Sequence, residues 1–310
     1  MSALICGSFA YDTIMGFPDQ FKNHILPDKV HMLNVAFLVP ELRREFGGCA
    51  GNIAYNLKLL GDEPLAMGTV GTDFDIYATW MDKHGISRDH VHIKKGHYTA
   101  QAFITTDIDD NQITAFHPGA MNLAHETSID QTNDIRLAIV APDGRDGMLQ
   151  HAQQLVDAKI PFIFDPGQGL PMFNGEELVK FSQQATYIAL NEYEAQLFQD
   201  KTGLSAKEVS KHVEALIITR GGQGSTIYTQ GEKLTIPCAK AEQLLDPTGC
   251  GDAYRAGLIH GILHGKEWQT TGRIASLLGA IKIEHHGTQN HAFSMPSFKA
   301  RFADEFGYSF

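Results

Sequence analysis

A lone carboxylate, Asp252, ends a turn of small residues in the stretch 246–252, which reads Asp-Pro-Thr-Gly-Cys-Gly-Asp. The residues that follow contain few helix breakers and are typical of a helix. The backbone N–H groups of Gly249, Cys250 and Gly251 would then lie at a helix N-terminus, where donors without an intrahelical partner can bind an anion. A carboxylate beside an anion site can take a proton from a hydroxyl group. An anion site with an acid–base carboxylate at its edge suits the transfer of a phosphoryl group to a hydroxyl, so the stretch favours a kinase.

A second glycine-rich run, 47–52, precedes a segment with the apolar pattern of an amphipathic helix. Glycine at Gly48 would allow a ligand to approach the backbone closely, and Asn52 can both donate and accept hydrogen bonds to hydroxyls. Asp12, which follows the first short strand, could bind the vicinal hydroxyls of a sugar. A loop that only caps a helix explains the glycines about equally well, and exposed loop aspartates are common.

Two further turns follow predicted strands. Asn191 and Glu194 begin a helix, where they could either cap it or position Mg²⁺ through water. The run Thr219-Arg-Gly-Gly-Gln-Gly224 lies between two strands, so a nucleotide could lie against its bare backbone at Thr219, Gly222 and Gly224. It is a poor dinucleotide fingerprint because no helix follows it, and the sequence contains no Walker loop.

The elements that must position these residues follow an α/β pattern. Short apolar runs alternate with helix-like stretches, which predicts a doubly wound, mostly parallel sheet flanked by helices. The runs end in polar or turn residues, and since ligands bind beyond the carboxyl ends of such strands, these residues should line one crevice. The turn residues are Asp143, Asp165, Asn191 and Thr219.

The first third of the chain has a different pattern. Residues 29–46 alternate partly, as a half-exposed strand does, and 100–106 with 111–116 are typical of a hairpin. Too few strands are present to build a second core, so we expect a single domain over 1–310. A small β-sheet lid, drawn from roughly 12–46 and 97–118, should be inserted in it.

Composition excludes several classes of protein. The net charge of −11 argues against nucleic acid and anionic membranes as partners. The hydrophobic fraction of 43% and the four scattered cysteines favour a cytoplasmic globular protein with reduced thiols. None of the clustered histidines has a partner at His-x3-His spacing, and no set of thiolates converges, so we expect no transition-metal site. These histidines are His84, His90, His92, His97, His285 and His286.

In order and spacing, these motifs resemble those of ribokinase-like (PfkB) carbohydrate and nucleoside kinases, from Gly7 to about Gln289. The resemblance implies a ribokinase-like fold, ATP as co-substrate and Mg²⁺ as cofactor. It implies Asp252 as the base, the anion hole at 249–251, and Mg²⁺ near Asn191 and Glu194. It places Thr219, Gly222 and Gly224 along ATP, and the sugar hydroxyls at Asp12, Gly48 and Asn52.

The acceptor is harder to infer, because a fold does not fix a substrate. Apolar side chains of the predicted lid, Phe37 and Phe116 among them, could cover a base, although each could equally be lid core. The segments 164–168 and 282–289 resemble those of prokaryotic adenosine and nucleoside kinases. We therefore expect ATP-dependent phosphorylation of a nucleoside 5′-hydroxyl, with adenosine as the favoured acceptor. The alternatives are a sugar kinase of ribokinase or fructokinase type, and a non-catalytic binding regulator.

Three details remain open at this level. A thiol at Cys250, near a helix N-terminus, could have a lowered pKa and be oxidised. K⁺ could bind near Asp246. Exposed edges of the lid could pair two copies into a homodimer.

Overall fold

The computed structural model describes residues 2–25, 31–32, 34–109, 111–131 and 134–310. Within these residues a large sheet has the strand order β13-β12-β11-β10-β9-β8-β1-β4-β5. Its strands pair in parallel from β11 to β5, and β12 and β13 extend the other edge through antiparallel pairs. The strands are β1 (Ser2–Cys6), β4 (Glu63–Val70), β5 (Val91–Ile93), β8 (Ile135–Val140), β9 (Phe162–Phe164), β10 (Tyr187–Asn191), β11 (Ala215–Thr219), β12 (Ser225–Thr229) and β13 (Glu232–Ile236).

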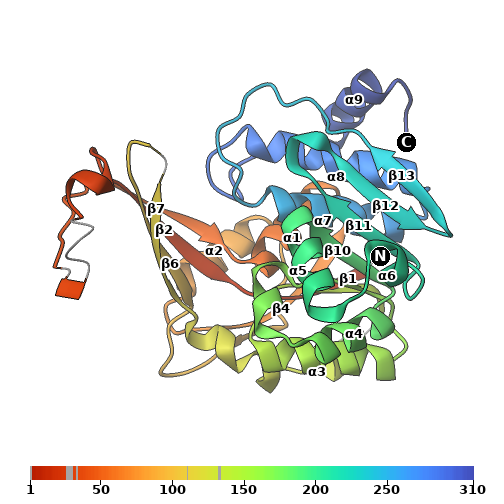
Figure 1. Cartoon of the computed structure of the whole chain (residues 1–310), viewed down its shortest axis with the longest axis horizontal. Helices are drawn as coiled ribbons and strands as arrows, with labels where there is room; N and C mark the ends of the chain where they lie inside the picture. The colour runs from red at the N-terminus through yellow and green to blue at the C-terminus, as the bar shows by residue number, and fades with distance from the viewer. Residues whose placement is uncertain (1, 26–30, 33, 110, 132–133) are drawn as a thin grey trace.

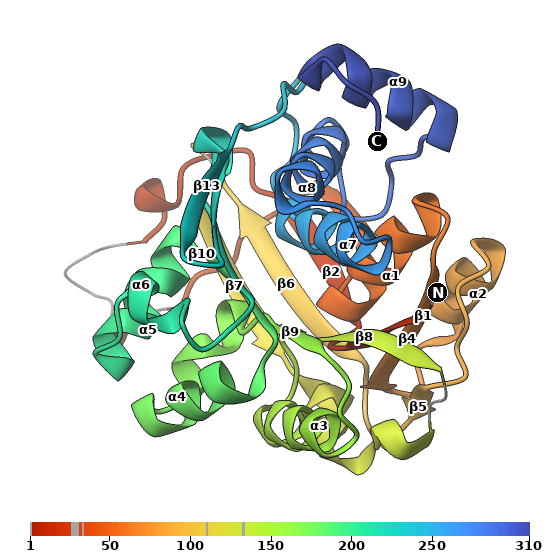
Figure 2. The same ribbon diagram turned by 90° about the vertical axis from the view of Figure 1, so that its right-hand side faces the viewer.

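Helices cover both faces of this sheet (Figures 1 and 2). One layer contains α1 (Cys49–Leu59), α2 (Asp75–Lys83), α7 (Cys250–Leu263), α8 (Trp268–Ile283) and α9 (Met295–Phe306). The other contains α3 (Arg145–Asp157), α4 (Gly175–Gln184), α5 (Glu192–Thr202) and α6 (Ala206–Val209).

Successive residues of the central strands pack into different cores. In β1, Ile5 lies in the core under α1 and α7, and Leu4 lies in the core under α3 and α4. In β8, Ile139 and Val140 divide in the same way. A parallel strand buried on both faces needs apolar residues at every position, which is why these strands are continuous apolar runs. The doubly wound fold class is confirmed.

A separate small sheet projects from the body (Figure 1) and has the strand order β3-β2-β6-β7. It pairs β2 with β3 and β6, and it pairs β6 with β7 in the hairpin that the sequence predicts. The strands are β2 (Ala10–Gly16), β3 (Glu41–Gly47), β6 (Ala100–Thr106) and β7 (Gln112–His117).

The strand expected over 29–46 is wrong for 34–40, which contain no regular structure. The ladder with β2 ends at the pair Gly16–Glu41, so residues 34–40 have no neighbouring strand among the described residues. Residues 26–30, 33 and 110 of the predicted lid segments lie outside the described residues. Among the helices that are described, none is long and apolar enough to cross a membrane.

Candidate active site

The carboxyl ends of the parallel strands lie along one edge of the large sheet. The strand order reverses between β1 and β8. Ligands of open α/β sheets bind at such a switch point. Two of the predicted turn residues lie near this point, in different surroundings. Asp165 is buried and holds a partner from α7, described below. Asp143 is buried beside Cys6, where burial raises the pKa of its carboxyl to about 8, so it lacks the charge that a cation ligand needs at neutral pH.

Asp252 lies in the first turn of α7, at the edge of this crevice, and is partly exposed. The side-chain amide of Asn52, on α1, donates a hydrogen bond to Asp252 Oδ2 at 2.8 Å. Desolvation raises the pKa of Asp252 to about 6, and the Asn52 hydrogen bond partly offsets that effect. A carboxylate with this pKa is ionised at neutral pH and still basic enough to accept a proton.

The turn before Asp252 has the shape that an anion site requires. Gly249 caps α7 with a φ of 80°, a conformation that glycine adopts without strain. Gly251 is exposed to solvent. The N–H of Cys250 donates to the Pro247 carbonyl at 3.2 Å, so the turn itself uses one of the three expected donors.

The expectation of a low thiol pKa at Cys250 is wrong. Burial raises the pKa of Cys250 to about 11, although the nearby Lys282 ammonium acts in the opposite direction. Desolvation of the thiolate therefore outweighs the helix N-terminus, and the thiol is not activated.

A buried lysine supports the same turn from below. Lys282 Nζ donates to the Asp246 carbonyl at 2.7 Å and to the His285 carbonyl at 3.3 Å. The Asp246 carboxylate accepts from the N–H groups of Gly287 and Thr248, both at 2.9 Å. Burial alone would raise the pKa of Asp246, but these hydrogen bonds outweigh it and lower the pKa. The loop before α7 is thus held at the Asp246 carbonyl by an ammonium group and at the Asp246 carboxylate by two backbone N–H groups.

An ion pair fixes α7 to the sheet one turn after the base. Arg255 donates two hydrogen bonds to Asp165, at 2.9 and 3.0 Å, and both side chains are buried. Arg255 also lies 4.0 Å from a carboxylate oxygen of Glu194. Because Arg255 is three residues after Asp252, it holds the same face of the helix that presents the base.

Asn191 and Glu194 form a capping box at the start of α5. Glu194 accepts from the Asn191 backbone N–H and from its side-chain amide, both at 2.7 Å. Burial raises the pKa of Glu194, and the Arg255 charge partly offsets that effect. The structural reading of this motif is therefore correct. Asn191 is exposed and also lies beside Thr219, its register partner on β11, at the mouth of the crevice.

The glycines of the turn after β11 differ in how much space surrounds them. Gly224 has a φ of 82°, and a Cβ there would lie 2.1 Å from the Ile236 carbonyl, so the β11–β12 turn itself requires glycine. A Cβ on Gly222 would contact nothing within 4 Å. Gly222 therefore leaves open space above the turn, where a ligand could lie.

The opposite end of the crevice is bordered by the small sheet. Asp12 lies on β2 over Gly47, where a Cβ would come within 2.5 Å of Asp12 Oδ2. Desolvation, followed by the negative charge of Glu45, raises the pKa of Asp12 to about 6. Gly48 caps α1 with a φ of 85° and approaches the Ser8 carbonyl closely. Asp12, Gly48 and Asn52 are thus brought together by β2 and α1.

Strand register decides which of the two predicted aromatic side chains faces the site. Phe116 pairs with Ala102, and Ala102 pairs with Asp12, so Phe116 and Asp12 lie on the same face of the small sheet. Phe116 is 53% exposed. Phe37 instead packs against Phe17 and Phe21, with ring centroids 4.8 and 5.0 Å apart. Phe37 is therefore part of an aromatic cluster with Phe17 and Phe21, which follow β2 in the chain.

Sequence reasoning did not identify several residues of the site. Arg255 could have been found from its spacing of three from Asp252 on a helix. Gln289 could not, because only the fold brings it to Asn52, to whose side-chain oxygen it donates at 3.0 Å. Outside this site, His260 and His264 have a His-x3-His spacing that is visible in the sequence.

Known proteins resemble this chain in both sequence and fold. The model of the pfkB family of carbohydrate kinases matches residues 23–294. A nucleoside kinase of Methanocaldococcus jannaschii is 30% identical over 261 residues, covering 83% of this chain and 85% of the relative. The structure of Burkholderia thailandensis nucleoside kinase in complex with inosine is 54% identical, with a TM-score of 0.91 and 99% of each chain covered. The same enzyme in complex with ADP-inosine has a TM-score of 0.88. With its matching fold and the match over most of its length, the chain belongs to the pfkB family of carbohydrate kinases.

Proposed function

We propose that the protein transfers the γ-phosphoryl group of ATP to the 5′-hydroxyl of a purine nucleoside, with adenosine and inosine as the leading acceptors. The observation that carries the proposal is the partly exposed Asp252 carboxylate, held by Asn52 beside the turn at 249–251. The similarity to a nucleoside kinase that binds inosine supports a nucleoside over a free sugar.

The chemistry follows from these positions. Asp252 accepts the proton of the 5′-hydroxyl as the new bond from O5′ to the γ-phosphorus forms. The bond between that phosphorus and the β–γ bridging oxygen breaks, and ADP leaves. The N–H groups of Gly249 and Gly251 would stabilise negative charge on the transferring group. Positioning and charge stabilisation supply most of the catalysis in such reactions.

Asn52 and Asp12 would hold the ribose. The Asn52 amide already donates to Asp252 and accepts from Gln289, which leaves one N–H and one lone pair for ribose hydroxyls. Asp12 would accept from a vicinal hydroxyl, and Phe116 would lie over the base from the same face of the small sheet.

For Mg²⁺, the residues present fit an outer-sphere role. Both oxygens of Glu194 accept hydrogen bonds from Asn191, which suits a carboxylate that orients metal-bound water better than one that ligates directly. The ion, when bound, would neutralise the phosphate oxygens. On the ATP side, Thr219, Gly222 and Gly224 would border the nucleotide along the β11–β12 turn.

We further propose that Lys282 takes the place of a monovalent cation near Asp246, because its ammonium already occupies the Asp246 carbonyl. Activity should then be equal in buffers of potassium and of tetramethylammonium salts. A strict requirement for K⁺ would refute this assignment.

An assay of ADP release with adenosine, inosine, guanosine, ribose and fructose tests the proposed function. We expect turnover with at least one purine nucleoside and a much lower kcat/KM for the free sugars. Turnover confined to the sugars would identify a sugar kinase. Binding of ATP and nucleoside without turnover would identify a non-catalytic regulator.

A further inference from the structure

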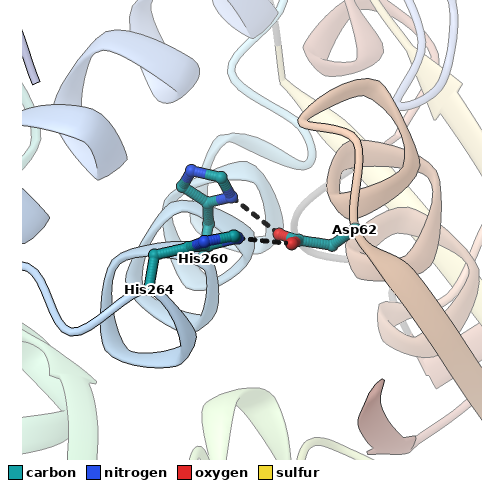
Figure 3. Close-up of side chains that lie close together, drawn as sticks. All are labelled: Asp62, His260 and His264. Atoms are coloured by element: carbon teal, nitrogen blue, oxygen red, sulfur yellow. Dashed lines mark hydrogen bonds and ion pairs between the residues drawn. The ribbon is translucent and has the colours of Figure 1, made fainter. Parts of the chain in front are cut away.

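Three potential metal ligands converge at the end of α7 that is opposite to Asp252 (Figure 3). His260 Nδ1 lies 2.7 Å from Asp62 Oδ2, and His264 Nε2 lies 2.8 Å from Asp62 Oδ1. Asp62 comes from the turn between α1 and β4, so the cluster joins two elements that are far apart in the sequence.

The geometry of this cluster is close to that of a metal centre. The spacing of four residues places both imidazoles on one face of α7. The three ligand atoms lie within 4.8 Å of one another. In a tetrahedral Zn²⁺ site with bonds of about 2.0–2.1 Å, ligand atoms are about 3.3 Å apart. Each imidazole nitrogen lies 2.7 or 2.8 Å from one oxygen of Asp62, so each of these two N···O pairs would separate by about half an ångström to admit an ion.

Charge also favours a cation at this position. The Asp62 side chain is 3% exposed, and among the described residues its ion-pair partners are the two histidines. A buried carboxylate is costly without a compensating charge. A divalent cation would supply that charge and accept lone pairs from both rings.

Access to the cluster is possible from one side. The side chain of His264 is 37% exposed, whereas that of His260 is 7% exposed. An ion could thus enter past His264, with water completing its coordination. Two imidazoles and one carboxylate suit first-row transition ions such as Zn²⁺ better than Mg²⁺ or Ca²⁺, which prefer oxygen ligands alone.

We propose that Asp62, His260 and His264 bind a divalent transition metal ion of the Zn²⁺ class. The site is separate from the phosphoryl-transfer centre, because His260 is eight residues, or about 12 Å of helix, beyond Asp252. It would connect the end of α7 to the α1–β4 turn.

Metal titration of the full chain tests the proposal. Metal-free protein is titrated with Zn²⁺ in excess Mg²⁺, and separately with Co²⁺, whose visible spectrum reports nitrogen ligation. We expect one Zn²⁺ equivalent that H264A binds about 10-fold or more weakly, since even outer-shell partners of a metal have effects of that size. H264C should restore binding, because cysteine is itself a zinc ligand.

H212A is the matched control, because His212 is an exposed histidine that pairs with Ser182 and, within the described part of the chain, with no carboxylate. Its Zn²⁺ affinity should equal that of the wild type. D62N provides a second route to the same loss if H264A folds poorly. Equal Zn²⁺ affinity and an unchanged Co²⁺ spectrum in the wild type and H264A would overturn the proposal.

Discussion

The helices α1 and α7 pack against each other, and an aspartate lies at each end of the pair. At one end Asp252 is partly exposed and receives a single side-chain amide hydrogen bond, from Asn52. At the other end Asp62 is buried and contacts two imidazoles. Burial raises the pKa of Asp252 to about 6, whereas at Asp62 the histidine hydrogen bonds outweigh burial and lower the pKa.

The difference shows how one residue type acquires two roles on one helix pair. A carboxylate with few partners keeps affinity for a proton and can act as a base. A carboxylate with charged or strongly hydrogen-bonded partners is held ionised and acts as an anchor. The number and kind of its partners therefore help to distinguish a carboxylate that acts as a base from one that acts as an anchor.

The largest expected effect is on the rate when the Asp252 end is changed. D252N should lower kcat by about 10²–10⁴-fold, the range for loss of a general base, with little change in nucleoside Kd. A folded-state pKa above the unfolded value favours folding at low pH, and this contribution is lost as the pH rises through about 6. D252N should therefore not lower Tm at neutral pH. A near-normal kcat would remove Asp252 from the assigned role.

The next effect concerns the ion pair that holds the Asp252 end in place. R255M leaves Asp165 buried without its cation, which should lower the free energy of unfolding by about 3–5 kcal/mol. The double variant D165L/R255M removes both charges and serves as the control. Denaturant unfolding should place it much closer to the wild type. If the single variant is as stable as the wild type, the pair does not anchor α7.

The pH dependence of kcat/KM should report the raised pKa of Asp252. The base must be ionised, so kcat/KM should fall about 10-fold per pH unit below a pH of about 6. Asp12, whose pKa is also raised to about 6, should add to this fall if it binds the ribose as an anion. A profile that is flat down to pH 4.5 would contradict both assignments.

Changing the Asp62 end should affect stability and leave the chemistry intact. D62N removes the negative charge that accepts from His260 and His264, which should cost about 1–3 kcal/mol of unfolding free energy. The kcat of the folded fraction should stay near the wild-type value, because Asp62 lies at the far end of α7. A large loss of kcat without a change in the free energy of unfolding would show that Asp62 supports the chemistry and not the stability.

The smallest effect is expected on the small sheet. F116A should weaken binding of a purine nucleoside by about 1 kcal/mol, the lower end of base–aromatic stacking, because Phe116 is half exposed. F37A is the control, since Phe37 packs against Phe17 and should not change the nucleoside KM. Equal KM values for the wild type and F116A would remove Phe116 from the base-binding surface.

The fold and the main turns of the site could be predicted from the sequence because local patterns encode them. Apolar runs such as 162–164 gave the strands, and the glycines before Asp252 gave a helix start. The strand expected at 34–40 failed because a strand needs a partner, and no local pattern shows where a ladder ends.

Contacts between distant segments were beyond the reach of local patterns. Gln289 reaches Asn52 across 237 positions, and Lys282 reaches Asp246 only because α8 returns under the turn. The sequence suggested a base with an anion site, but not the residues that hold Asn52 and the turn in place. Register also separated Phe116 from Phe37, which composition alone could not do.

The side-by-side arrangement of α1 and α7 also has an electrostatic consequence. Both N-termini lie where Asn52 meets Asp252, so two helix macrodipoles, each equivalent to about half a positive charge, act on the same spot. Both C-termini lie near Asp62, where the same dipoles place about half a negative charge each. The helix pair therefore favours phosphate at one end and cations at the other before any side chain contributes.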